Sequence, residues 1–256
     1  MAVDEAILEA SGQGQVLPTL RLYTWEPPCL SLGFAQPYAD VDRGRLSQLS
    51  WELVRRPTGG RAILHTDELT YSICGPNDEP CLAGSVLESY RGLSVALLQA
   101  LSLIGIHAQA LPSAHQEAGV RAEQGAVCFD VPSNYEITWE GKKLLGSAQA
   151  RRKNGVLQHG TLPLCGDLGR ITQALVYPDE MARSEAETSL LRRATTVEQV
   201  IGSQISWESA AEAFCLAFQQ TLDLELLPDE LTPAEIQRAQ ELARGKYNSP
   251  SWTERI

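Results

Sequence analysis

The sequence has few of the features that mark membrane-bound, secreted or metal-binding proteins. No apolar run approaches the roughly 18 residues that span a bilayer, and the opening MAVDEAILEASGQG is acidic, without the basic region that precedes the apolar block of a secretion signal. The six cysteines form no CxxC pair and no Cys/His spacing typical of zinc sites. We therefore expect a reducing, cytoplasmic location, no membrane association, no metal and no disulfide framework.

Positive charge is also scarce. Lys and Arg number 21 against 32 Asp and Glu, which leaves a net charge of −11. We exclude nucleic-acid partners, because neutralising phosphates requires a basic surface. An acidic protein partner would need a local basic patch. The length of 256 residues and the hydrophobic content of 43% are enough for one large domain with a sizeable core.

The first half of the chain combines short strands with two helices. The spacing of Val3, Ile7 and Ala10 predicts an opening helix that stops at Gly12. A longer helix is predicted at 86–104, after a capping box of Ser85 and Glu88. Runs of β-branched and aromatic residues bounded by Pro and Gly predict strands at 19–25, 29–34 and 51–56, with two more within 62–75.

The second half divides into a strand region and a helical region. Residues 112–127 have no periodicity and are predicted to form a loop. Three strands are then predicted in quick succession, at 133–139, 142–151 and 156–164, as an antiparallel meander. From 167 onward the pattern is helical, with a long helix after Ser206 and another that Thr232, Pro233 and Glu235 open and Gly245 stops.

The segment RRPTGGRAILH, at 55–65, is the first candidate for chemistry. Pro57, Gly59 and Gly60 allow a tight turn and a close backbone approach to a ligand. Arg55, Arg56 and Arg61 bring positive charge to that turn, which suits a phosphate or a carrier-bound pantetheine. The alternative is a plain hairpin turn with solvated arginines.

The second candidate is the strand pair within CFDVPSNYEITWEGKKLLGSAQARRKNGVLQHGTLPL, at 128–164. Period-2 alternation predicts one polar face and one apolar face of small residues, the latter suited to packing on the core or to lining a slot for an alkyl chain. Of Gln158 and His159, only one can point the same way as Lys143 in a regular strand. The predicted polar face holds Lys143, Ser147, Gln149 and Arg151, and the predicted apolar face holds Leu144, Gly146, Ala148 and Ala150.

Cys128 is the best candidate nucleophile. It ends a polar loop and precedes a strand pair rich in basic residues, whose cations can lower the pKa of a thiol. Cys215, beside an apolar helical stripe, fits the ordinary role of a buried cysteine instead. Lys143 has a structural alternative, since a lysine after a hairpin turn is commonly a surface residue.

These motifs resemble those of the lipoate and octanoate transferase/ligase superfamily, related to biotin protein ligases. The resemblance lies in RRPTGGRAILH, GKKLLGSAQ and LQHGTL, and it is strongest to octanoyltransferases of the LipM type, which share VCFDxPSxYE ahead of GxKxxGSAQ. It covers most of the chain, from the MAVDEAI helix to KYNSPSW. Members usually have a strand before that helix, so the expectation is a truncated or misassigned start, and a missing edge strand would expose a sheet edge.

The resemblance implies a fold and a set of site residues. The fold is α/β, with a large mixed sheet and a smaller sheet flanked by helices; we expect residues 1–204 to form the catalytic domain and 205–256 a small helical appendage of the same domain. Cys128 would accept the acyl group and Lys143 would contact the acyl carbonyl. The predicted substrate-binding residues are Arg56, Thr58, Gly59, Gly60, Arg61, His65, Gly146, Ser147, Ala148, Gln149, His159 and Gly160.

The implied activity is octanoyl transfer from an octanoyl-acyl carrier protein, through a cysteine thioester, to a lysine of a lipoyl-carrier protein. Acceptors of this kind are the glycine cleavage H protein and the lipoyl domains of 2-oxoacid dehydrogenases. No cofactor or nucleotide is expected, because a thioester is already activated. The alternatives are an ATP-dependent lipoate ligase, an octanoyl amidotransferase between lipoyl domains, and a non-catalytic lipoyl-domain binder. The basic run Arg151, Arg152 and Lys153 is a candidate docking patch for the acidic donor.

Overall fold

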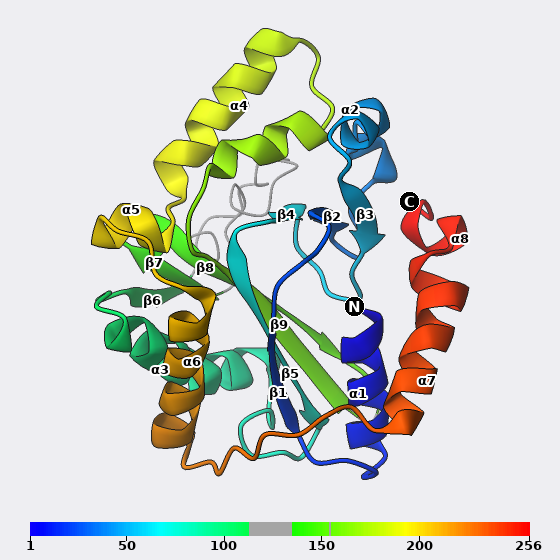
Figure 1. Ribbon diagram of the computed structural model, residues 1–256, viewed down its shortest axis with the longest axis vertical. Helices are drawn as coiled ribbons and strands as arrows, with labels where there is room; N and C mark the ends of the chain where they lie inside the picture. Colours follow the sequence, from blue (N-terminus) through cyan, green and yellow to red (C-terminus); the bar gives the residue numbers. More distant parts are fainter. Residues whose placement is uncertain (113–134, 154) are drawn as a thin grey trace.

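The computed structural model describes residues 1–112, 135–153 and 155–256, which form two β-sheets surrounded by helices (Figure 1). The large sheet has six strands in the order β1-β5-β9-β8-β7-β6. Two long central strands, β5 and β9, pair along their full length and carry much of the core. The strands of this sheet are β1 (Thr19–Tyr23), β5 (Glu68–Pro76), β6 (Gln109–Pro112), β7 (Tyr135–Trp139), β8 (Lys142–Arg151) and β9 (Gly155–Pro163).

Every strand pairing of the large sheet is antiparallel among the described residues. The predicted meander of β7, β8 and β9 is confirmed. The α/β class with a large and a small sheet is confirmed as well, but the mixed pairing occurs in the small sheet and not in the large one. Tight turns join β7 to β8 and β8 to β9, and such turns permit only antiparallel neighbours.

The small sheet has the strand order β3-β2-β4, with β2 (Cys29–Leu32), β3 (Glu52–Arg55) and β4 (Ile63–His65). β2 pairs with β3 in parallel and with β4 antiparallel. A parallel pair needs a crossover connection, and here the crossover contains the short helices η1 (Tyr38–Asp40) and α2 (Arg43–Gln48). The RRPTGGR turn connects β3 to β4.

The predicted helices are present. The opening helix is α1 (Ala2–Gly12), and α3 (Val86–Leu103) begins at the predicted capping box of Ser85 and Glu88. Among the described residues, no helix is long and apolar enough to cross a membrane. The helices after β9 are η4 (Leu168–Ala174), α4 (Glu180–Arg193), α5 (Val197–Ile201), α6 (Trp207–Leu222), α7 (Pro233–Leu242), η5 (Ala243–Tyr247) and α8 (Pro250–Thr253).

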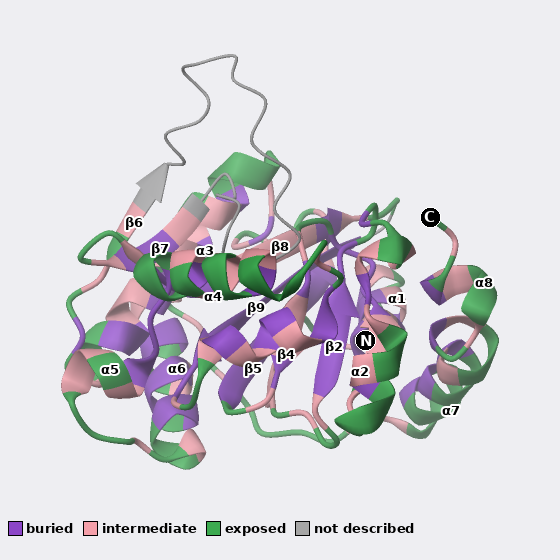
Figure 2. Cartoon of the chain, turned by 90° about the horizontal axis from the view of Figure 1, so that it is seen from above, coloured by how far each residue is buried: buried purple, intermediate pink, exposed green. Residues whose placement is uncertain are grey.

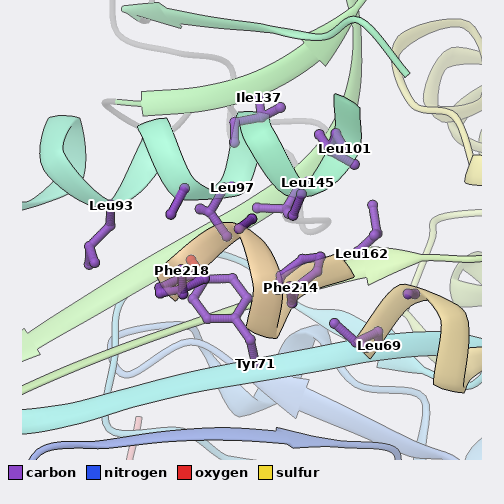
Figure 3. Close-up of a cluster of buried hydrophobic side chains, with 14 of the residues drawn as sticks. Leu69, Tyr71, Leu93, Leu97, Leu101, Ile137, Leu145, Leu162, Phe214 and Phe218 are labelled. Atoms are coloured by element: carbon purple, nitrogen blue, oxygen red, sulfur yellow. The ribbon is translucent and has the colours of Figure 1, made fainter. Parts of the chain in front are cut away.

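One face of the large sheet packs against α3 and α6 to form the main core (Figure 3). Tyr71 of β5 lies against Phe214 of α6, with 6.0 Å between ring centroids, and Phe218 stacks on Phe214. α3 contributes its apolar stripe, including Leu93 and Leu97. Residues 205–256, predicted as a helical appendage, contain α6, α7, η5 and α8 with a non-helical connection between α6 and α7, and α6 lies within the main core.

The opposite face of the large sheet is covered by α1 at one end and by the small sheet at the other. Asp4 of α1 is fully buried and accepts hydrogen bonds from Arg21 and Ser72, which fixes the helix on β1 and β5. Figure 2 shows the inner strands β2 and β5 largely buried, whereas α4 and α7 expose much of their surface. α7 packs along α1 (Figure 1).

The predicted stop at Gly245 is wrong. α7 begins at the predicted capping box, but the chain continues through Gly245 in the π-helical turn η5. Tyr247 at the end of that turn is buried and donates to Glu5 of α1. Packing against α1 therefore holds the helical path past the glycine, whose effect as a helix breaker is only about 1 kcal/mol.

Candidate active site

A cavity of about 530 Å³ lies between the large sheet and the loops of the small sheet. Its floor is formed by strands β5, β9 and β8, and its roof by the RRPTGGR turn, β4 and the loop after β2. The start of α3 contributes Val86 and Tyr90 at one side. Cavities of about 300–1,000 Å³ are typical of small-molecule sites, so this cavity is the candidate active site.

The structure brings most of the predicted substrate-binding residues to this one cavity. Two predicted residues do not line it, Thr58 and Lys143, although both contact residues that do. Cys128 lies outside the described residues. The predicted residues that line the cavity are Arg56, Gly59, Gly60, Arg61, His65, Gly146, Ser147, Ala148, Gln149, His159 and Gly160.

The floor of the cavity follows from the strand register. Gly146 of β8 is paired with Thr161 of β9, which is paired with Thr70 of β5. Paired residues of an antiparallel ladder present their side chains on the same face, so these three positions form a row across the sheet. Ala148 and His159 form the next row. His159, and not Gln158, therefore faces the cavity.

Lys143 is on the face opposite to the one predicted for it. Thr138 pairs with Lys143 but Ile137 pairs with Leu145, so Leu144 is an extra residue in β8, a β-bulge. A bulge reverses the alternation beyond it. Accordingly, a Cβ built on Gly146 would lie 3.7 Å from the Lys143 Nζ, which places the ammonium on the cavity side of the sheet.

The Lys143 ammonium is buried and held by an ion pair. Its side chain is only 3% exposed, and its Nζ lies 2.7 Å from a carboxylate oxygen of Glu136 on β7. The backbone is fixed as well, because the Thr195 amide donates to the Lys143 carbonyl. A buried charge is stable only when it is paired and hydrogen-bonded, so Glu136 is part of what keeps this cation at the cavity. The VCFDxPSxYE motif contains Glu136, but no partner for it was predicted.

The other side chains of the predicted polar face of β8 form a hydrogen-bond network with neighbouring protein groups. Ser147 bonds to the Tyr71 hydroxyl at 2.6 Å, and Gln158 donates to the same hydroxyl. Gln149 donates to Gln158 and to Ser89 of α3. Burial raises the pKa of Tyr71 to about 12, so the phenol stays protonated. Arg151 extends the network to a carbonyl before α3, so its side chain faces inward.

Gly160 is needed for the same packing. A Cβ at this position would lie 2.5 Å from the Gly146 carbonyl oxygen and 2.6 Å from the Tyr71 ring. No side chain fits there without moving the strand, so the glycine lets β8 and the Tyr71 ring approach each other closely.

The arginines of the RRPTGGR turn do not all present charge to a ligand, contrary to the sequence-based expectation. Arg55 is fully buried and donates to the carbonyls of Gly33, Gln36 and Thr253. Arg56 is buried too, and it donates to carbonyls of the turn itself and to the Ser31 carbonyl and hydroxyl. These two guanidiniums hold the roof together.

Arg61 differs from the two arginines before it. It lines the cavity, and within the described part of the chain its guanidinium has no hydrogen-bond partner.

The turn approaches the loop after β2 so closely that a Cβ on Gly33 would overlap the Gly60 carbonyl oxygen, and Gly60 has a positive φ of 91°. Both glycines are therefore required for the roof.

His159 connects the floor of the cavity to its roof. Its Nε2 lies 2.6 Å from the Thr58 hydroxyl of the turn. Burial lowers the pKa of His159 to about 3, so the imidazole is neutral near neutral pH. A neutral histidine here orients the turn by hydrogen bonding and does not add charge.

A polar wall beside the cavity was not predicted. Trp25 stacks on His65, with 4.2 Å between ring centroids, and its indole N–H donates to the Thr70 hydroxyl. Thr70 donates to Glu68, which also holds the His65 Nδ1 at 2.5 Å. The Ser31 hydroxyl contacts the His65 Nε2 at 2.8 Å. The alternation of Glu68, Thr70 and Ser72 with apolar residues could have identified the strand face, but not its partners.

The five described cysteines are free thiols, and none of them lines the cavity. Burial raises the pKa of Cys29 to about 12 and that of Cys81 to about 11. It also raises the pKa of Cys74, Cys165 and Cys215. A thiol with a raised pKa is a poor nucleophile at neutral pH. Among the described cysteines, none is a candidate for acyl transfer at this site.

Residues 1–219 match the family described as the lipoyl protein ligase A/B catalytic domain. A curated octanoyltransferase LipM of Brevibacillus brevis is 38% identical over 255 residues, covering 98% of this chain and 92% of the relative. The LipM octanoyltransferase of Kyrpidia tusciae is 40% identical over 257 residues, covering 100% and 93%.

Two solved structures share the fold. The bi-partite lipoate protein ligase of Thermoplasma acidophilum superimposes with a TM-score of 0.79 at 25% identity, covering 99% of this chain and 89% of that one. A lipoate-protein ligase A bound with ATP gives 0.77 at 25% identity, covering 99% and 92%. The two-sheet architecture around the cavity is therefore shared with proteins that handle lipoate.

Proposed function

This chain belongs to the lipoyl protein ligase A/B catalytic domain family, and we propose that its cavity carries out octanoyl transfer by way of an enzyme thioester. The chain is an octanoyltransferase of lipoate biosynthesis, since curated octanoyltransferases are 35–40% identical to it over nearly its full length. The observation that carries the proposal is the position of the buried Lys143 ammonium next to Gly146, one of the glycines on the floor of the cavity.

The shape of the cavity suits an acyl chain. Gly146 and Ala148 present backbone and a small side chain to its floor, which leaves room for an alkyl chain above the sheet. Trp25 and Ile63 add apolar surface to the lining. Burying the chain's methylene groups contributes about 0.8 kcal/mol each, so such a slot would bind the octanoyl group strongly.

The first chemical step is attack of a cysteine thiolate on the carbonyl carbon of the donor thioester. A new C–S bond forms, the carbonyl π electrons move to oxygen, and collapse of that oxyanion expels the carrier thiolate. We assign the attacking thiolate to Cys128, because the resemblance places it there and none of the described cysteines lines the cavity. Lys143 would donate a hydrogen bond to the developing oxyanion.

In the second step the amino group of the acceptor lysine attacks the enzyme thioester. The C–N bond of the amide forms, the C–S bond to Cys128 breaks, and the amine loses a proton to a base. Aminolysis of a thioester is downhill, so the proposed reaction needs no nucleotide. This separates it from the ligase reaction, in which a free acid is first activated.

Proteins that carry lipoyl domains are the acceptors of this family. We propose octanoyl-acyl carrier protein as the donor, and the glycine cleavage H protein or the lipoyl domains of 2-oxoacid dehydrogenases as acceptors. We also propose that the reaction runs in the cytoplasm, which the free thiols of the five described cysteines support.

The test is intact-mass measurement of the protein after incubation with octanoyl-acyl carrier protein, without ATP. We expect one octanoyl adduct on the wild type, none on Cys128→Ala, and an undiminished adduct on Cys215→Ala, whose sulfur lies on α6 outside the cavity lining. Transfer to a lipoyl domain should disappear with the adduct. Modification of a lipoyl domain that strictly requires ATP and free octanoate would contradict the proposal and favour a ligase.

A further inference from the structure

Thr161 on the cavity floor has a buried hydroxyl without a hydrogen-bond partner in the part of the chain that the structure describes. Its side chain belongs to a residue only 1% exposed. Buried hydroxyl groups nearly always have a partner, because leaving one unpaired costs free energy. An exception on the floor of a substrate cavity points to a bond that is made with the substrate.

The neighbouring Thr70 provides a comparison, because its hydroxyl has two hydrogen-bond partners within the protein. Thr70 is paired with Thr161 in the strand register, and both line the cavity. The Thr70 hydroxyl, however, donates to Glu68 and accepts from the Trp25 indole. A threonine at this level of the cavity floor can thus find hydrogen-bond partners within the protein, so its place in the sheet does not explain why the Thr161 hydroxyl has none among the described residues.

Thr161 and the Lys143 ammonium are both neighbours of Gly146. The other partner of Thr161 in the register is Gly146, and the Gly146 Cβ position would be 3.7 Å from the Lys143 Nζ. Directly opposite residues have Cβ positions about 4.5–5.5 Å apart. Because Gly146 has no side chain, an oxygen atom above it can accept hydrogen bonds from the ammonium and from the hydroxyl together.

We propose that the Thr161 hydroxyl is a catalytic hydrogen-bond donor, which together with Lys143 binds the carbonyl oxygen of the octanoyl thioester. This inference rests on the proposed function. When the thiolate attacks, the electron pair that moves to the carbonyl oxygen is stabilised by both donors. When the intermediate collapses, the carbonyl re-forms and the bond to the leaving sulfur breaks. Thr161 keeps its proton throughout.

The experiment compares Thr161→Val, which deletes the hydroxyl at constant shape, with Thr161→Ser, which keeps it. We expect Thr161→Val to lower the acylation rate at saturating octanoyl-acyl carrier protein about 10²-fold, the usual effect of losing one oxyanion donor, with little change in KM. Thr161→Ser should stay within a few-fold of wild type. The melting temperature of Thr161→Val should be unchanged or higher, because an unpaired buried hydroxyl has been removed.

Thr172→Val is the matched control. It also deletes a buried threonine hydroxyl, but that hydroxyl donates to the Gly169 carbonyl within η4 and does not line the cavity. This variant should lose stability and keep its acylation rate.

A second measurement separates catalysis from packing. Two unreactive donors are compared: one in which a CH2 group replaces the thioester sulfur, so that the carbonyl remains, and an S-octyl thioether without a carbonyl. Thr161→Val should weaken binding of the ketone and leave binding of the thioether unchanged.

The outcomes are distinguishable. Wild-type protein that forms no octanoyl adduct would refute the proposed function itself. A wild-type protein that is acylated, with Thr161→Val equally fast, would overturn the inference about Thr161 alone. Equal losses in Thr161→Val and Thr161→Ser, or equal weakening of both analogues, would also overturn it and assign Thr161 to packing.

Discussion

The two faces of the β8–β9 strand pair contain polar residues that are used in different ways. On the face toward α3, Ser147 and Gln158 bond to the Tyr71 hydroxyl, and Gln149 donates to Gln158 and to Ser89 of the helix. On the cavity face, Lys143 and Thr161 stand beside glycine and alanine. The polar groups of the face toward α3 satisfy one another, and Ser147 and Gln149 keep these bonds although they also line the cavity near the start of α3. Polarity alone therefore does not locate chemistry in this sheet.

The largest expected effect is on the cavity face. Lys143→Met keeps the apolar stem but removes the ammonium, and we expect octanoyl transfer to fall by at least about 10³-fold because oxyanion stabilisation is lost. Single-turnover acylation by octanoyl-acyl carrier protein measures it. Lys142→Met is the control, since Lys142 pairs with Trp139 and points to the opposite side of the strand. Similar losses of acylation rate in both variants would mean that the cavity-side position of Lys143 is not what makes it important.

His159 tests the cavity face by pH. Its pKa of about 3 in the folded protein lies below the ordinary value of 6.5. The unfolded chain therefore binds a proton first as pH falls, and the folded state loses stability between about pH 6.5 and pH 3, by up to about 1.4 kcal/mol per pH unit. Above pH 6.5 both states are neutral and this contribution is flat. The free energy of unfolding of His159→Gln, measured with denaturant at several pH values in that range, should fall less steeply with decreasing pH than that of the wild type. The same pH dependence in both proteins would show that His159 does not titrate as described.

Gln158 tests the structural face. Gln158→Leu leaves Gln149 without one acceptor and the Tyr71 hydroxyl without one donor. We expect the free energy of unfolding to drop by about 1–3 kcal/mol, while acylation falls far less than in Lys143→Met. Gln237→Leu on the exposed side of α7 is the control and should change stability little. A loss of acylation comparable to that of Lys143→Met would mean that the network takes part in chemistry.

The smallest effect is expected at the turn between the two strands. Arg152 and Lys153 are exposed there, and Arg152 reaches the Pro57 carbonyl of the RRPTGGR turn. Charge reversal at both positions should reduce the association rate with the acidic donor several-fold and flatten its salt dependence, without affecting a small octanoyl thioester. Stopped-flow measurement of acylation at several salt concentrations gives the association rate and its salt dependence.

Charge reversal of Arg192 and Arg193, an exposed basic pair at the end of α4, is the matched control. Equal rates and salt slopes for both double variants would place the docking surface elsewhere. Arg61 is then the remaining basic candidate on the turn, because Arg55 and Arg56 are buried in hydrogen bonds to backbone carbonyls.

Much of the fold could be predicted from the sequence, because its signals are local. The capping boxes before α3 and α7, the Gly141 turn and the alternation in β9 each act over a few residues, and the structure confirms these elements. β6 and α2 were missed because both are short, although Asp42 caps α2 by accepting from the Arg45 amide. The π-helical turn through Gly245 depends on contacts with α1, which no local pattern encodes.

The candidate site was predictable as a set of residues but not as an arrangement. The motifs identified residues that share one cavity, yet the side of the sheet was wrong for Lys143 because the bulge at Leu144 leaves no mark in the hydrophobic pattern. The inward direction of Arg55 and the contact of Trp25 with Thr70 depend on tertiary neighbours. The role of Cys128, which lies outside the described residues, stays a prediction.

The bulge at Leu144 also affects how related sequences should be compared. Between Lys143 and Gly146 the chain holds one residue more than a regular strand would need to put both on one side, and the bulge accommodates that extra residue so that the ammonium stays on the cavity side. The number of residues in this stretch is thus as informative as their identity. A relative with the lysine and the GSAQ motif but one residue fewer between them would need no bulge, because a regular strand would already put its lysine on the cavity side. A relative with the same spacing but a regular strand would instead turn its lysine into the helical layer.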